Sequence, residues 1–217
     1  MERGEIPDGE IQISLMKPCD DGSPTSEKQY PAQIEGLVAQ IRDRARNLYE
    51  SRQLLCTEAV VVALNQGLGG GLTQAQAIAV AAPFSEALGG SGCLCGALSG
   101  AVMASGLLLG KEHPYRFRKD IRSCACELHQ AFRASHGAVC CRVLSNKFRQ
   151  DKKAHFRQCA GLTAGAAELA ARLILRKRPE LAGSADEEFI KQHQSRLGGA
   201  FLRLVKYFRI GSLINEQ

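Results

Sequence analysis

The centre of this chain reads Gly89-Gly90-Ser91-Gly92-Cys93-Leu94-Cys95-Gly96-Ala97-Leu98-Ser99-Gly100-Ala101, a glycine-rich loop that runs into an apolar helix. Glycines in the loop allow backbone conformations that other residues rarely adopt. After the second cysteine the pattern turns helical and continues to about Leu109, with Gly96, Gly100 and Ala104 four apart on one face. We expect this face of small residues to let a second helix approach closely.

Two cysteines are predicted to lie at helix starts. Cys95 opens the helix that follows the loop, and Cys159 opens a helix to about Arg178, close to the basic residues Lys153 and Arg157. The positive end of a helix dipole and nearby cations both favour the thiolate form of cysteine. Because the thiolate attacks disulfides and binds metals, both positions are candidates for redox or metal chemistry.

Apolar residues at helical spacing predict helices along most of the remaining chain. Proline and glycine separate the segments, and no strand pairing is required beyond one short strand at 11–15. The predicted fold is therefore all-α, a compact array of about six to eight helices with no significant sheet. Besides the central helix at 94–109, the expected helices cover 31–51, 54–66, 73–82, 115–135, 140–148, 159–178 and 187–208.

Charge and composition divide the chain into three parts. Residues 1–30 are polar and rich in proline and glycine, which predicts a flexible acidic tail. Residues 31–178 form the expected helical domain. Residues 179–217 form a linker and an amphipathic helix, whose Phe201 and Leu204 face should dock on the body or on a second chain, so a homodimer is an open alternative.

The number of cysteines and the lack of long apolar segments indicate in which cellular compartment the protein works. The chain has 217 residues, which is enough for one hydrophobic core plus appendages, and nine of them are cysteines. The N-terminus shows neither the basic nor the apolar region of a signal peptide, and no stretch is apolar for the length of a membrane span. We therefore expect a cytoplasmic protein, in which clustered cysteines are more often reactive, metal-binding or buried than bridged.

The hexapeptide Cys95–Gly100 resembles the core motif of the C-GCAxxG-C-C family of putative redox-active proteins. Members of that family carry one cysteine upstream of the motif and two downstream. In this chain Cys56, Cys141 and Cys159 match those positions in order and in their flanking residues. The resemblance covers roughly residues 45–176.

The resemblance implies a redox site built from four cysteines, and a redox protein as partner. The site would either ligate an Fe–S cluster for electron transfer or act as a thiol/disulfide relay. A zinc site in a structural or regulatory protein is the alternative. The spacing of the cysteines does not distinguish these kinds of site, because no ligand pair forms a C-x-x-C knuckle. The candidate catalytic and metal-binding residues are Cys56, Cys95, Cys141 and Cys159, and the candidate cofactor-binding residues are Gly90, Gly92, Cys93 and Gly96.

The chain also departs from the family. Family members often carry glycines directly after the phenylalanine that precedes the motif, where this chain has Ser85–Leu88, and Cys93 and Cys140 are additional cysteines. The domain is also seen in split-Soret cytochrome c, yet no haem is expected here because the chain lacks C-x-x-C-H. Cys56 is predicted in mid-helix, where a buried core thiol is the alternative interpretation.

Uneven charge suggests a further alternative. The first 36 residues hold eight acidic and three basic side chains, so the rest of the chain carries a net +11 to give the overall +6. The basic helices after Lys147 could bind nucleic acid or an acidic partner. A solvated basic face explains the same charges more simply, so nucleic-acid binding is not expected.

Overall fold

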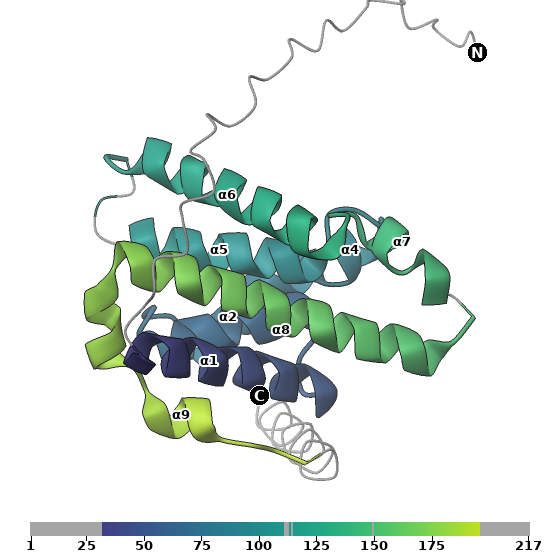
Figure 1. Cartoon of the computed structure of the whole chain (residues 1–217), viewed down its shortest axis with the longest axis horizontal. Helices are drawn as coiled ribbons and strands as arrows, with labels where there is room; N and C mark the ends of the chain where they lie inside the picture. Colours follow the sequence, from purple (N-terminus) through teal and green to yellow (C-terminus); the bar gives the residue numbers. More distant parts are fainter. Residues whose placement is uncertain (1–31, 111–112, 114, 149, 196–217) are drawn as a thin grey trace, which may run out of the picture.

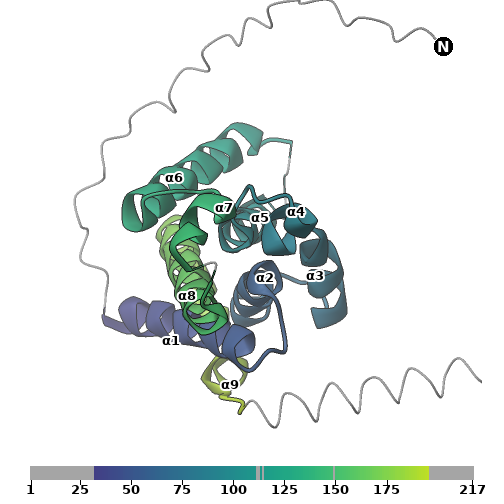
Figure 2. The same ribbon diagram turned by 90° about the vertical axis from the view of Figure 1, so that its right-hand side faces the viewer.

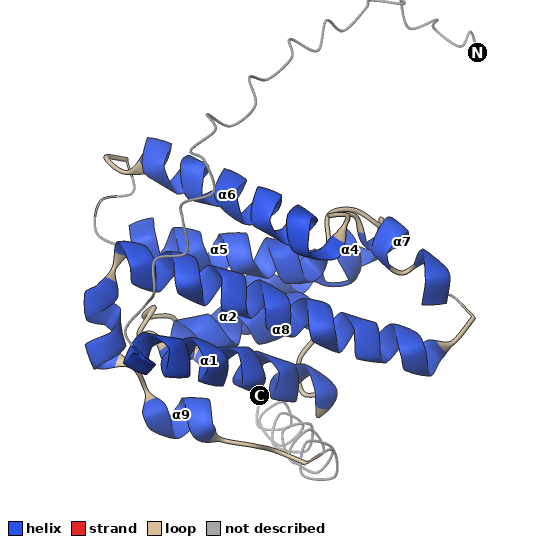
Figure 3. Cartoon of the chain, viewed as in Figure 1, coloured by secondary structure: helices blue, strands red, loops and turns tan. Residues whose placement is uncertain are grey.

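A computed structural model describes residues 32–110, 113, 115–148 and 150–195 of the chain. Across these residues the chain folds into helices joined by short connections, and none of them forms a strand (Figure 3). The prediction of an all-α fold is confirmed. The acidic tail at 1–30 and the apolar face around Phe201 lie outside the described residues, so both stay predictions.

Five long helices build the body of the molecule, and α8 lies at its centre (Figure 1, Figure 2). The helix α8 packs against the other four, and α5 packs against both α2 and α6. These helices are α1 (Ala32–Glu50), α2 (Cys56–Gly67), α5 (Gly96–Gly110), α6 (Arg118–His136) and α8 (Lys152–Lys177). Short segments connect them: α3 (Gln74–Ala81), η1 (Ala82–Phe84), α4 (Ser85–Gly90), α7 (Cys141–Leu144), η2 (Asn146–Phe148), η3 (Pro179–Ser184) and α9 (Glu187–Lys191).

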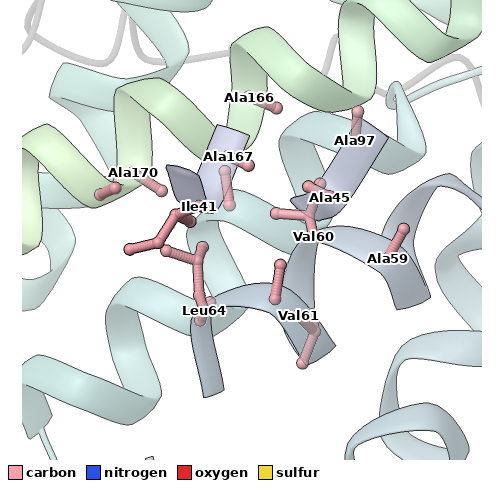
Figure 4. Close-up of a cluster of buried hydrophobic side chains, with 14 of the residues drawn as sticks. Ile41, Ala45, Ala59, Val60, Val61, Leu64, Ala97, Ala166, Ala167 and Ala170 are labelled. Carbon is pink, nitrogen blue, oxygen red and sulfur yellow. The ribbon is translucent and has the colours of Figure 1, made fainter. Parts of the chain in front are cut away.

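Alanine and glycine let these helices pack closely. The core gathers side chains of α1, α2, α5 and α8, many of them alanines with no exposed surface (Figure 4). At Gly100 of α5 an added methyl group would lie 2.8 Å from the carbonyl oxygen of Thr57 and 3.0 Å from the Cβ of Val60. The predicted face of small residues therefore packs directly against α2.

Two predicted helix starts are wrong, and both concern cysteines. The helix α8 begins at Lys152, because the Asp151 carboxylate caps it by accepting the N–H groups of Lys153 (2.9 Å) and Ala154 (3.0 Å). Cys159 consequently lies in the third turn of α8 rather than at its start. Conversely, Cys56 is the first residue of α2 rather than a mid-helix residue.

The helix predicted over 187–208 is interrupted within the described residues. After α9 the chain becomes extended at Gln192, so the expected helix over 187–208 does not continue through 192–195. Asn47 of α1 holds this extended segment, since its side chain donates to the Gln194 carbonyl and accepts from the Gln194 N–H, both at 2.9 Å. Arg44 donates to the Gln192 carbonyl at 2.9 Å. Segment 179–195 is thereby attached to the helical body.

Replacing Asn47 by alanine should lower the free energy of unfolding by about 1–2 kcal/mol, because its buried side chain loses two hydrogen bonds with Gln194 and one with Arg44. Thermal or denaturant unfolding measures the change, and limited proteolysis after Lys191 should become faster. The exposed Gln33 of the same helix serves as the control, since its replacement by alanine should leave both measurements unchanged. Equal effects of the two substitutions would contradict this role of Asn47.

Candidate thiol site

Three of the four motif cysteines stand at helix starts. Cys56 opens α2 and Cys141 opens α7, while Cys95 directly precedes α5 and its carbonyl accepts the N–H of Ser99 at 2.9 Å. Figure 2 views the molecule from the end at which α4 and α7 lie. Only Cys159, in α8, lies within a helix. The site thus draws on four separate segments of the chain.

The structure brings the four thiols into one neighbourhood. Cys56 and Cys141 each influence the ionisation of Cys95 and of Cys159, and Cys56 also influences that of Cys141. A methyl group added at Gly96 would lie 2.6 Å from the sulfur of Cys56. Glycine at this position therefore allows the start of α5 to approach the Cys56 thiol.

Burial raises the pKa of three of these thiols, Cys95, Cys141 and Cys159. Desolvation raises the pKa of Cys95 to about 12, even though the N–H groups of Ala97 and Leu98 favour its thiolate. Burial, followed by the nearby Cys141 and Cys56, raises the pKa of Cys159 to about 11. Burial also raises the pKa of Cys141. The predicted stabilisation of thiolates by helix starts is thus outweighed by the loss of water around the sulfur.

A raised thiol pKa makes stability fall at alkaline pH. The unfolded chain releases the Cys95 proton near pH 9, whereas the folded protein holds it until about pH 12, so ionisation favours the unfolded state between these values. We expect Cys95→Ala to make the loss of stability between pH 9 and pH 11 shallower by up to about 1.4 kcal/mol per pH unit. Denaturant unfolding of the reduced, metal-free protein checks this, and equal slopes for the two proteins would contradict it.

Tyr49 is a further residue of the site that sequence reasoning missed. Its hydroxyl is hydrogen-bonded to Cys159, and this bond favours the Cys159 thiolate. The Tyr49 ring stacks on Phe156 of α8 with centroids 5.0 Å apart, which fixes the orientation of the hydroxyl. Burial raises the pKa of Tyr49, followed by the nearby Cys159 and Cys56. Tyr49 lies at the end of a predicted amphipathic helix, where the sequence carries no signal for such a role.

The two additional cysteines form a disulfide. Cys93 in the loop is bonded to Cys140, immediately before α7, with Cα atoms 4.4 Å apart. The expectation that the clustered cysteines are unbridged is wrong for this pair. While the bond stands, the sulfur of Cys93, a predicted cofactor-binding residue, is not free to bind a cofactor.

The loop glycines predicted to bind a cofactor differ in their surroundings. Gly90 and Gly92 both have positive φ, at 96° and 93°, which glycine alone adopts readily. Gly90 has open space where a side chain would be, whereas a methyl group at Gly92 would lie 2.9 Å from the Nε of Arg142. Gly92 therefore faces the start of α7, and of the predicted glycines only Gly96 touches a motif cysteine.

A left-handed turn precedes the loop. Glu86, Ala87 and Leu88 have φ of 54°, 60° and 56°, which costs a residue with a side chain roughly 1–2 kcal/mol. This turn is where the family often has glycines, and it accounts for them, because glycine adopts the conformation without that cost. The chain thus keeps a strained turn next to the thiols, and Glu86 also influences the ionisation of Cys141.

Across the described residues, no three His, Cys, Asp or Glu side chains are arranged to hold one metal ion. The donor chemistry nevertheless fits an Fe–S cluster, for which four cysteine sulfurs are the usual ligands. The sulfurs would have to move closer together from the arrangement seen here to form such a ligand set.

Ion pairs engage the arginines near the end of α8, on which the nucleic-acid alternative relied. Arg172 pairs with Glu35 at 2.5 Å and with Glu168 at 3.0 Å, and Arg176 pairs with Glu127.

None of the described helices combines the length and apolar character needed to cross a membrane.

One comparison with known proteins gives a match. Residues 54–173 match the model of a family described as "Putative redox-active protein (C-GCAxxG-C-C)". The matched region includes all four motif cysteines, the glycine loop and most of α8. No curated protein and no solved structure matches the chain.

Proposed function

The chain belongs to the C-GCAxxG-C-C family, because the matched residues 54–173 make up more than half of it, and we propose that its redox centre is an iron–sulfur cluster. The cluster would serve in electron transfer with a redox protein partner. Its ligands would be the four motif cysteines, Cys56, Cys95, Cys141 and Cys159.

The observation that carries this proposal is the mutual influence of four thiols, of which Cys95 is buried and the other three are half-buried. Three of them have a raised pKa, so they are poor nucleophiles at neutral pH. A bound metal deprotonates a coordinating thiol outright, and its positive charge offsets the repulsion among neighbouring thiolates. Thiols that stay protonated in this way are better suited to ligate a cluster than to attack the disulfide of another protein.

Neighbouring groups of the chain would tune such a centre. The N–H groups of Ala97 and Leu98 point at the Cys95 sulfur, and the Tyr49 hydroxyl bonds to that of Cys159. Hydrogen bonds to ligating sulfurs stabilise their negative charge and shift the reduction potential. A bound cluster would supply one-electron chemistry, while the helix starts would orient the sulfurs and exclude water.

Reconstitution of the reduced protein with ferrous iron and sulfide under anaerobic conditions tests the proposal. We expect a coloured protein whose visible absorption is bleached by dithionite and returns on reoxidation. Cys95→Ser should lose this absorption. Cys124→Ser is the matched control, because Cys124 is equally buried but interacts with Lys177 and Glu127 rather than with the motif cysteines.

Two other results would point to the alternatives. A colourless protein that retains stoichiometric zinc through the same four cysteines would indicate a structural or regulatory metal site. A metal-free protein in which two motif cysteines cycle between thiols and a disulfide would indicate a relay. Either result would overturn the cluster.

A further inference from the structure

The disulfide between Cys93 and Cys140 lies at the surface. Cys93 is exposed and Cys140 is half-buried, whereas the neighbouring motif residue Cys95 is only 3% exposed. Neither of the bridged cysteines belongs to the family's four positions. An exposed disulfide in a chain whose other cysteines include buried thiols is open to attack by an external thiol.

This bond joins two segments that each lead into a motif cysteine. Two backbone hydrogen bonds flank it: Cys95 N–H donates to the Val139 carbonyl at 2.8 Å, and Arg142 N–H donates to the Gly92 carbonyl at 2.9 Å. The Arg142 guanidinium also donates to the Ser91 carbonyl at 2.7 Å. The disulfide thus lies in the middle of a short antiparallel pairing that holds the loop against the start of α7.

Cys95 is buried beside this pairing, and the half-buried Cys141 directly adjoins it. Cys95 is two residues beyond Cys93, and its own N–H makes one of the flanking bonds. Cys141 directly follows Cys140 and opens α7, a helix of only four residues with few contacts of its own. Without the covalent link, a few hydrogen bonds on the surface are left to hold the loop and α7 together.

We propose that a dithiol reductant opens the Cys93–Cys140 disulfide, and that its opening exposes the thiols of Cys95 and Cys141. A thiolate of the reductant attacks the sulfur of Cys93, the more exposed half, and forms a mixed disulfide. The sulfur of Cys140 leaves as a thiolate and takes up a proton from water. The second thiol of the reductant then displaces Cys93, so the reductant ends as a disulfide and two thiols form in this protein.

The consequence is a reducible latch over part of the thiol site. In the oxidised protein the loop and α7 are held together beside Cys95 and Cys141, and in the reduced protein they can separate. Disulfides that form in reducing compartments are usually transient and redox-sensing, which suits the expected cytoplasmic location. The latch concerns access to the thiols and does not require a bound cluster.

Differential alkylation of the metal-free wild-type protein tests the latch. The protein is treated with reduced dithiothreitol or left untreated, then labelled with iodoacetamide for increasing times, and each cysteine is quantified by mass spectrometry. We expect Cys93 and Cys140 to become labelled only after reduction. Labelling of Cys95 and Cys141 should then be at least tenfold faster than in the oxidised protein, while Cys124 stays protected.

Three results would overturn the proposal. The disulfide could resist dithiothreitol under native conditions, or reduction could leave the labelling of Cys95 and Cys141 unchanged. Parallel labelling of the buried Cys124 would show that reduction unfolds the chain rather than opening a latch. A Cys93→Ser variant, which lacks the bond without any reductant, should reproduce the fast labelling. Since iron is absent throughout, a failed reconstitution would not affect this result, and the latch could fail while the cluster stands.

Discussion

Replacing Cys93 and Cys140 together by serine should lower the free energy of unfolding by roughly 4 kcal/mol, measured by denaturant unfolding of the non-reduced protein. The bond closes a loop across a sequence separation of 47 residues, and it restricts the unfolded chain more than the folded one. Folded proteins of this kind are stable by only about 5–15 kcal/mol, so the loss should be conspicuous.

The single variants provide the control for this prediction. Replacing either cysteine breaks the disulfide as completely as replacing both. The variants Cys93→Ser and Cys140→Ser and the double variant should therefore be destabilised by nearly the same amount. A loss below about 1 kcal/mol in the double variant would show that the unfolded chain is restricted in some other way.

Replacing Gly100 by alanine should destabilise the protein by about 1–3 kcal/mol. The added methyl group would lie 2.8 Å from the Thr57 carbonyl oxygen and 3.3 Å from the Thr57 Cα, both backbone atoms that cannot rotate away. The helices α2 and α5 would have to separate, and the Cys56 thiol at the start of α2 would move with them.

Gly161 is the matched control for Gly100. It also lies within a helix, in α8, but no atom is within 4 Å of an added methyl group. Gly161→Ala should therefore stabilise the protein by about 0.5–1 kcal/mol, the usual gain of alanine over glycine in a helix. Thermal unfolding of the two variants measures both changes, and a stabilised Gly100→Ala variant would contradict the close packing of α2 and α5.

Most of the fold could be predicted from the sequence because helical spacing and helix-ending residues are local signals. The start of α8 differs from the prediction because apolar spacing begins only near Cys159, whereas the helix is capped further upstream by Asp151. The interruption of the predicted C-terminal helix at 192–195 has no local signal, because the hydrogen bonds of Asn47 to Gln194, which hold the chain extended, join residues far apart in sequence.

The thiol site could be predicted only in part for a similar reason. Cysteine order and flanking residues identified Cys56, Cys95, Cys141 and Cys159 as candidates, and the structure places their thiols near one another. Their burial, which sets the protonation of the thiols, depends on tertiary packing and has no local signal. The role of Tyr49 likewise depends on the contact between α1 and α8.

The most direct test of the account is the iron and acid-labile sulfide content of the reconstituted protein, measured per chain for six proteins. These are the wild type, the four single serine variants of Cys56, Cys95, Cys141 and Cys159, and the Cys124→Ser control. We predict stoichiometric iron and sulfide in the wild type and the control, and a large loss in each of the four variants. Iron and sulfide contents that are the same in all six proteins, or absent from the wild type, would contradict a cluster held by these four cysteines.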